Sequence, residues 1–107
     1  MPVINIQYDN YKVKEAQILA LSEAIQKIVS HSTKIEDVFV YTNSSQIKVK
    51  IAPIEIFIQM SAHKIKNRKM LVQEIKSKLQ NWKKKNSFPH KINFTFIPMD
   101  WDIEIGI

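Results

Sequence analysis

The sequence predicts an α+β fold in which two β-α-β units share one four-stranded sheet. Three patterns predict it: strands with period-two alternation, two long segments with apolar residues at helical spacing, and a repeat of this order after Pro53. The chain has 107 residues, the length of one domain, and 45% of them are hydrophobic, as in folded proteins. We expect one domain over residues 1–107, with internal repeats at roughly 2–51 and 53–107. Both helices should cover one face of the core sheet, with short extra strands outside it.

The first half of the chain predicts three strands and one helix. Residues 2–8 alternate apolar and polar side chains, as a strand with one buried face does. Residues 38–41 are β-branched and aromatic, and residues 47–51 alternate isoleucine or valine with lysine, so both favour strands. Residues 12–31 favour an amphipathic helix, because apolar side chains recur three and four residues apart. Those side chains are Ile18, Leu21, Ile25 and Ile28.

The second half repeats this order. Residues 54–60 alternate and predict a strand, and residues 64–85 predict the second helix. Residues 92–96 predict another strand, which we expect Pro98 to end. Residues 101–107 alternate apolar and acidic side chains, which favours a C-terminal strand that pairs with a partner. The apolar stripe of the second helix consists of Leu71, Ile75, Leu79 and Trp82.

Composition excludes several kinds of site. The chain has no cysteine, so it has no disulfide and no cysteine-based zinc site. Its one glycine, Gly106, excludes the glycine-rich loops that hold phosphate groups. No apolar segment approaches the roughly 20 residues that span a bilayer, and the N-terminus lacks the pattern of a signal peptide, so we expect a cytoplasmic protein without a membrane partner. His31, His63 and His90 show no close metal-ligand spacing, and we expect neither a metal nor a cofactor.

The net charge of +6 raises nucleic acid as a partner. Most of the basic residues, however, fall between residues 64 and 91, on the predicted outer face of the second helix and in the loop after it. Such a face is typical of a solvated helix. An RNA-binding sheet would also need stacking aromatic side chains in its central strands, and the predicted strands 47–51 and 54–60 contain only Phe57. Both observations disfavour nucleic acid, so a basic ferredoxin-like module is the weaker alternative.

Several segments together resemble one family. The opening sequence MPVINI, with Pro2 directly after the initiator methionine, resembles the start of tautomerase superfamily members, as does the later strand 38–40. Residues 53–64 are similar to the repeat in that superfamily, and residues 94–98 to a segment of a small bacterial branch of it. The ending, residues 103–107, is similar to a C-terminal hairpin that reaches a neighbouring subunit. The members we compare are macrophage migration inhibitory factor, oxalocrotonate tautomerase and carboxymethyl-hydroxymuconate isomerase.

The resemblance implies a duplicated β-α-β tautomerase-like fold, a homotrimer, and keto-enol tautomerisation or isomerisation of a small carbonyl compound. Pro2 would be the catalytic general base. Removal of Met1 leaves Pro2 as a secondary amine, and a neutral amine takes a proton from carbon beside a carbonyl and returns it elsewhere. The enolate formed in between needs donors or positive charge nearby. The substrate-binding candidates are Lys12, Lys34, Lys64 and Trp101.

Two departures from the family limit the substrate. Oxalocrotonate-type members place a substrate-binding arginine in the second strand, where this chain has Phe39. The one arginine, Arg68, falls in the second predicted helix. A dicarboxylate is therefore disfavoured, and a smaller or more apolar keto-enol substrate fits better.

Each candidate also has a purely structural interpretation. Lys12 and Lys64 are equivalent in the repeat, but both can also be solvated lysines in the first turn of a helix. Lys34 can likewise be an ordinary surface residue. Trp101 is equally a packing residue, and proline is common at the first position of a strand. A non-catalytic binding protein of the same fold therefore stays open beside the enzyme.

Overall fold

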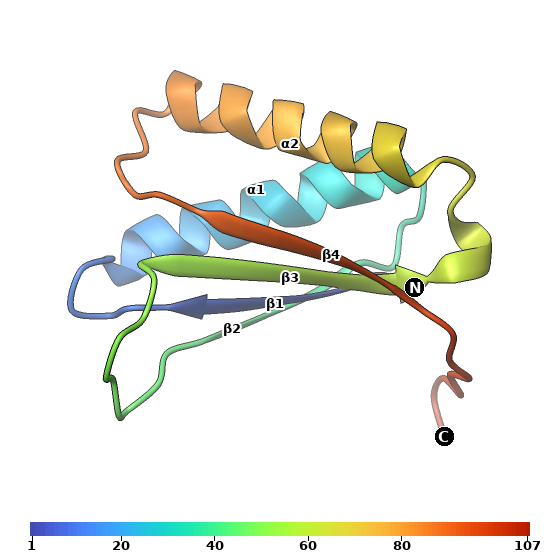
Figure 1. Cartoon of the computed structure of the whole chain (residues 1–107), viewed down its shortest axis with the longest axis horizontal. Coiled ribbons are helices and arrows are strands. Elements are labelled where there is room, and N and C mark those ends of the chain that lie inside the picture. Colours follow the sequence, from blue (N-terminus) through green and yellow to red (C-terminus); the bar gives the residue numbers. More distant parts are fainter.

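The computed structural model describes residues 1–107 and shows a four-stranded sheet with two helices on one side of it (Figure 1). A short 3₁₀ turn, Ala62–Lys64, precedes the second helix. The main elements, in chain order, are β1 (Val3–Tyr8), α1 (Glu15–Thr33), β2 (Phe39–Asn43), β3 (Ile54–Ser61), α2 (Arg68–Lys85) and β4 (Asn93–Met99).

The strands lie in the order β2-β1-β3-β4. β1 is parallel to β2, β3 is parallel to β4, and the two central strands β1 and β3 are antiparallel. Each parallel pair is joined through a helix, so the sheet consists of two β-α-β units side by side, as the sequence predicts. This order excludes the ferredoxin-like alternative, in which another strand separates the parallel strands of each unit.

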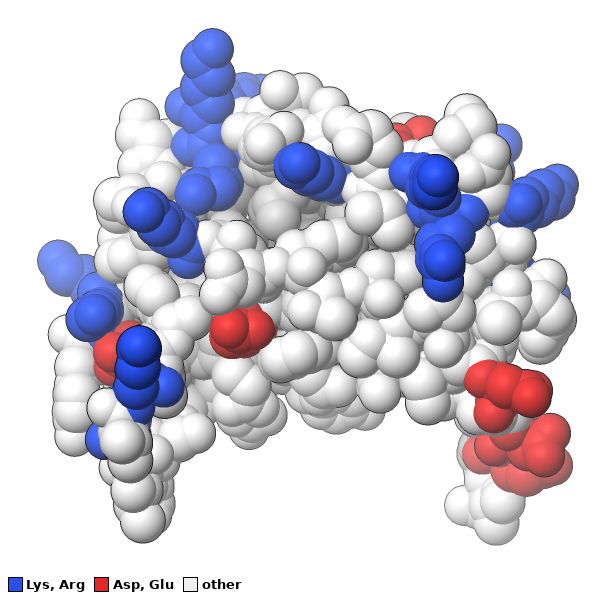
Figure 2. Space-filling model, in the orientation of Figure 1, with Lys and Arg blue, Asp and Glu red and all other residues white.

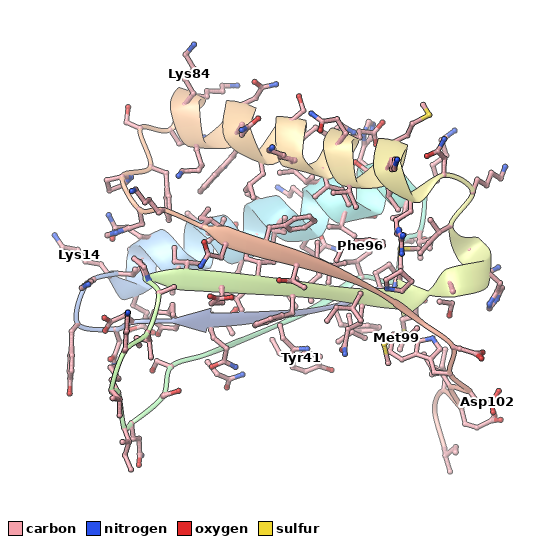
Figure 3. All side chains as sticks on the ribbon, viewed as in Figure 1. Lys14, Tyr41, Lys84, Phe96, Met99 and Asp102 are labelled. Atoms are coloured by element: carbon pink, nitrogen blue, oxygen red, sulfur yellow. The ribbon has the colours of Figure 1, made fainter.

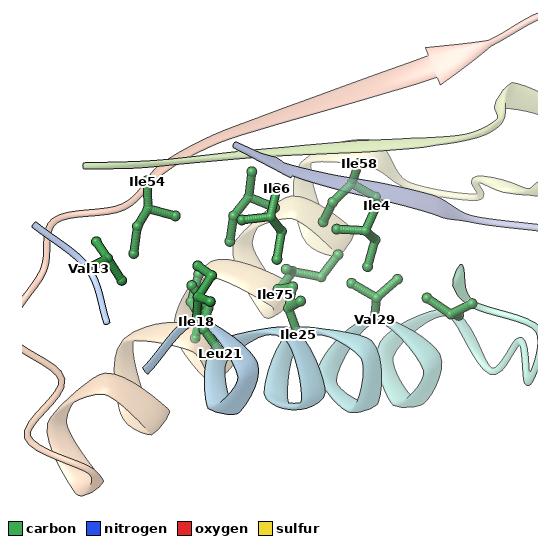
Figure 4. Close-up of a cluster of buried hydrophobic side chains, with 13 residues drawn as sticks. Ile4, Ile6, Val13, Ile18, Leu21, Ile25, Val29, Ile54, Ile58 and Ile75 are labelled. Carbon is green, nitrogen blue, oxygen red and sulfur yellow. The ribbon is translucent and has the colours of Figure 1, made fainter. Parts of the chain in front are cut away.

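The core lies between the sheet and the helices (Figure 4). Ile4 and Ile6 of β1 sit opposite Ile58 and Ile56 of β3, and all four side chains are fully buried. Period-two alternation places them on the face that the helices cover. Burying one such side chain contributes about 1.5–3 kcal/mol. The helix side chains that complete the buried cluster are Ile18, Leu21, Ile25, Val29, Ile75 and Leu79.

Both helices begin later than the sequence pattern predicts. Residues 9–13 form a turn instead, in which the Asp9 carbonyl accepts hydrogen bonds from the backbone N–H groups of Lys12 and Val13, at 3.0 and 2.9 Å. α2 begins at Arg68 because the Asn67 side chain caps it and accepts from the Met70 N–H at 3.1 Å. The side chain buried on the last turns of α1 is Val29 rather than the predicted Ile28, which is half-buried.

Three strand predictions are corrected. Residues 47–51 and residues 101–107 form no strand, although both alternate. A strand needs a neighbour for its backbone groups, and the chain by itself offers these segments none. The last strand, β4, runs through Pro98 to Met99, because β4 is an edge strand and one missing N–H can face outward there.

The face of the sheet opposite the helices is uncovered. Phe96 lies on the helix side, whereas Tyr41 lies on the open side (Figure 3). One row across the open face runs through Phe39, Val3, Gln59 and Ile97, by the register of the strands. This face therefore mixes apolar and polar side chains. Neither helix combines the length and apolar character that crossing a membrane requires.

We expect Ile58→Ala to lower the free energy of unfolding by about 2–5 kcal/mol, because it leaves a cavity between β3 and the helices. Leu19→Ala is the matched control, since Leu19 is 59% exposed on α1, and it should change the stability by less than about 0.5 kcal/mol. Urea unfolding at one protein concentration measures both. Equal losses would contradict the core described above.

Candidate functional site

Pro2 is buried at one end of the central strands. Its carbonyl accepts a hydrogen bond from the Phe39 N–H at 3.2 Å, which holds it against the start of β2. On the other side, Val3 pairs with Gln59, so Pro2 lies beside the last residues of β3. Pro2, the residue directly before β1, therefore lies between the start of β2 and the end of β3.

A cavity of about 310 Å³ opens at the same end of the sheet. Because β1 and β2 are parallel, α1 brings the chain back along the sheet, and its last residues reach the end where β1 begins. The end of β3 and the start of α2 lie there too, because β3 is antiparallel to β1. Met60 contributes to the wall from β3, next along the strand from Gln59, but Pro2 itself does not line the cavity. The other lining residues are Ser32, Thr33, Lys34, Lys64, Ile65, Lys66, Asn67, Met70, Leu71 and Glu74.

The lining of this cavity is positively charged. Lys34 ends α1 in a left-handed conformation with φ of 57°, and Lys64 and Lys66 flank Ile65 in the segment between β3 and α2. The one carboxylate, Glu74, is paired with Lys78 at 3.5 Å. Hydrogen bonding by Ser32, with a smaller contribution from the charge of Lys78, lowers the pKa of Glu74 below its ordinary value of 4.5. Three lysines against one carboxylate favour a ligand with negative charge.

Trp101 lies at the same end of the sheet but outside the cavity lining. Its indole Nε1–H donates to the Ser61 hydroxyl at 2.7 Å, and Ser61 is the buried last residue of β3. This hydrogen bond attaches the chain after β4 to the end of β3. Trp101 is half-buried.

Lys12 is at the other end of the sheet. It belongs to the turn after β1, whereas its repeat equivalent Lys64 follows β3. Because β1 and β3 are antiparallel, equivalent positions of the two units lie at opposite ends. Within one chain the structure therefore brings Pro2, Lys34, Lys64 and Trp101 to one end and leaves Lys12 at the other.

Of the 11 residues that line the cavity, only Lys34 and Lys64 were predicted as site residues from the sequence; those not predicted include Met60, Ile65, Lys66 and Met70. One signal for two of them is present in the sequence. Lys64, Ile65 and Lys66 follow the carboxyl end of a strand and precede a helix, which is a common position for binding loops. Met70 belongs to the exposed side of α2 and carries no such signal. No three His, Asp or Glu side chains are grouped so that they could hold a metal ion.

No protein-family model and no curated protein matches the sequence. The structure, in contrast, is similar to solved structures over nearly its whole length. A 5-carboxymethyl-2-hydroxymuconate delta-isomerase aligns with a TM-score of 0.68 at 11% identity, covering 99% of this chain and 89% of that one. A fused 4-OT protein, described as a symmetric trimer, aligns with a TM-score of 0.67 at 13% identity, covering 98% and 94%.

A third structure is a macrophage migration inhibitory factor-like protein from Entamoeba histolytica. It aligns with a TM-score of 0.59 at 15% identity, covering 96% of this chain and 93% of that one. This chain has the fold of the tautomerase superfamily. The duplicated β-α-β architecture expected from the sequence resemblance is thereby confirmed. At such low identities the tautomerase-like fold is what the comparison establishes.

We expect Glu74→Gln to lower the thermal unfolding midpoint at about pH 7, and to lower it progressively less as the pH falls below 4.5. The pKa of Glu74 is lowered in the folded state, so the stabilisation is complete above the ordinary value of 4.5 and disappears as pH falls through the lowered pKa. Glu23→Gln is the control, because Glu23 is exposed on α1 and forms no ion pair. A difference between Glu74→Gln and the unmodified protein that persisted in acid would contradict this assignment.

Proposed function

We propose that this protein is a tautomerase or isomerase that moves a proton within a small carbonyl compound, with Pro2 as the general base. The observation that carries the proposal is the position of Pro2: it is buried at the end of the sheet where a cavity lined by Lys34, Lys64 and Lys66 opens. The fold shared with an isomerase supports the same reaction class. The proposal requires that Met1 be removed, because only then is Pro2 a secondary amine.

The chemistry follows from these neighbours. Burial disfavours the protonated amine, so Pro2 is available as a base. It removes a proton from the carbon beside a carbonyl group and returns it at another carbon or oxygen of the same molecule. The negative charge that develops on the carbonyl oxygen is stabilised by Lys34 and Lys64 from the cavity wall. Trp101 closes the same end of the sheet as an aromatic wall.

The substrate in this proposal is small and carries at most one carboxylate. The cavity presents lysines and no arginine, and position 39 is phenylalanine. Arg68 stands at the start of α2 with an exposed side chain and does not line the cavity. In this cavity, therefore, no arginine of this chain can form a bidentate pair of hydrogen bonds with a second carboxylate.

We further propose that the protein is a homotrimer. One of the similar structures is described as a symmetric trimer, and the open sheet face of this chain gives such an assembly a surface to bury. That face carries aromatic and aliphatic side chains next to polar ones, including Phe39, Tyr41 and Phe57. The cavity is also open on one side, where a second chain can complete it.

We expect Pro2→Ala to reduce the rate of enol-keto conversion of an aromatic pyruvate by a factor on the order of 10²–10⁴, because the secondary amine is lost. Pro89→Ala, in an exposed loop, is the matched control and should leave the rate unchanged. Intact mass spectrometry establishes whether Met1 has been removed. Equal rates for Pro2→Ala and the unmodified protein would refute the catalytic role, and a retained Met1 without activity would indicate a binding protein of the same fold.

We expect Lys64→Met to lower kcat by a factor on the order of 10², because the enolate loses one of its cations while the length of the side chain is kept. Lys84→Met, on the exposed last turn of α2, removes the same charge far from the cavity and should have no effect. Steady-state kinetics on the same substrate measure both. A change in KM alone would assign Lys64 to substrate binding without a role in the chemical step.

A further inference from the structure

A groove runs between α2 and the edge strand β4, on the helix side of the sheet. It consists of two cavities, of about 530 and 570 Å³, which share Val72 of α2 and Phe94 of β4 as wall residues. The cavities therefore adjoin, and together they extend along most of α2. β4 is the outermost strand, so no further helix or strand of this chain lies beside α2 there (Figure 1).

The floor of the groove is apolar. Five side chains form it, two from α2 and three from β4 and the residue before it: Val72, Leu79, Ile92, Phe94 and Phe96. Leu79 is buried, whereas the other four are only half-buried. Their free surfaces face the same groove instead of being scattered singly over the molecule. A contiguous apolar surface of this kind marks an interaction site.

The rim of the groove is positively charged. Four cations line it from α2, and no carboxylate does: Arg68, Lys69, Lys76 and Lys83. Figure 2 shows lysine and arginine side chains along α2, apart from the acidic residues at the end of the chain. The one carboxylate of α2, Glu74, is paired with Lys78, which contacts His31 and Ser32 of α1. Glu74 is thus turned toward α1, and the groove favours a partner with negative charge.

The groove side of α2 has the spacing at which one helix packs against another. Charged and apolar residues follow each other there at intervals of three and four: Lys69, Val72, Lys76, Leu79 and Lys83. The lysines repeat every seven residues, which is about 10 Å along the helix axis. A second helix with carboxylates every seven residues and apolar side chains between them matches both the cations and the floor.

Two other anionic partners match the groove less well. A bilayer surface is flat, whereas the apolar side chains lie inside the groove and the exposed positions of α2 from Gln73 to Lys84 are all polar. Single-stranded nucleic acid stacks its bases on free aromatic faces. Phe94 and Phe96 instead pack against the core of the protein.

We propose that this groove binds an acidic amphipathic helix of a partner protein, which lies beside α2 as a third helix on the sheet. Its carboxylates pair with Lys69, Lys76 and Lys83, and its apolar face covers the floor. The trimer proposed above buries the opposite face of the sheet, so the two contacts use different surfaces. Pro2 does not line the groove, so this binding does not rest on the proposed reaction.

A designed peptide tests the groove. The probe is a helix as long as α2, with glutamate every seven residues, leucine three residues after each glutamate, and alanine or glutamine elsewhere. We expect a dissociation constant in the micromolar range and ¹⁵N NMR shift changes at residues 68–83 and 92–96. No binding, or shift changes confined to the cavity that Lys34 and Lys64 line, would overturn the proposal.

Two further probes separate the peptide from the other anionic partners. Vesicles of phosphatidylcholine and phosphatidylserine, and a single-stranded oligonucleotide of mixed sequence, should leave the resonances of Phe94 and Phe96 unperturbed. If either probe bound more tightly than the peptide and shifted these resonances, the groove would be assigned to that partner and the proposal would be wrong.

Charge reversal tests the rim. We expect Lys69→Glu with Lys76→Glu to raise the dissociation constant of the peptide at least about tenfold. Lys84→Glu with Lys85→Glu makes the same change in net charge on exposed residues outside the groove, and should have little effect at physiological salt. A peptide with lysine in place of each glutamate should bind the Lys69 and Lys76 variant instead. Equal losses from both variants would indicate general charge attraction and would overturn the proposal.

A neutral substitution tests the floor. We expect Val72→Gln to weaken peptide binding by a factor on the order of ten, because it removes apolar contact without changing the charge. Met70→Gln is the matched control on an exposed part of α2 outside the groove and should bind normally. Circular dichroism verifies that each variant is folded. An unchanged dissociation constant for Val72→Gln would show that charge alone holds the peptide, which contradicts docking in the groove.

The Pro2→Ala variant separates this proposal from the proposed function. It should lose the reaction and still bind the peptide with an unchanged dissociation constant. A protein without tautomerase activity that binds the peptide leaves the groove supported, whereas an active enzyme that does not bind the peptide refutes the groove alone.

Discussion

The antiparallel pairing of β1 with β3 is the contact on which the rest of the structure depends. It puts Ile4 opposite Ile58 and Ile6 opposite Ile56, and all four side chains are fully buried under the helices. It also relates the two β-α-β units, because the two strands that begin the units run in opposite directions at the centre of one sheet. Each end of the sheet therefore holds the first residue of one unit and, from the other unit, the connection between its first strand and its helix.

The composition of the candidate site is a consequence of that pairing. Pro2 directly precedes β1, and the antiparallel pairing places the end of β3 beside it, followed by Lys64 and Ile65. The parallel pair β1 and β2 requires a returning helix, which delivers Lys34 to the same place. Residues from three separate segments of the chain thus lie at one end of the sheet, although no two of these segments are adjacent in sequence. Pro2 is buried at the end of the sheet where these lysines lie, but it does not itself line their cavity.

The placement of both helices on one side has a second consequence. One sheet face and the segments 45–51 and 100–107 remain uncovered, and all lie on the side away from α1 and α2. Their aliphatic side chains and opposite charges are unexplained within a single chain.

The sequence by itself determined the elements whose partners are local. The period-two alternation at Ile4 and Ile6 predicted a strand, and the spacing of Leu21 and Ile25 predicted a helix. Both predictions succeed because these periodicities depend only on backbone geometry. The resemblance at Pro2 also led to the right fold, while the helix starts at Glu15 and Arg68 depended on local turns that the pattern did not show. Only the tertiary structure decided what depends on distant neighbours. Lys12 and Lys64 are equivalent in the repeat but lie far apart, because antiparallel strands place equivalent positions at opposite ends of a sheet. Residues 47–51 and 101–107 stay outside the sheet, because a strand forms only where another strand accepts its backbone hydrogen bonds.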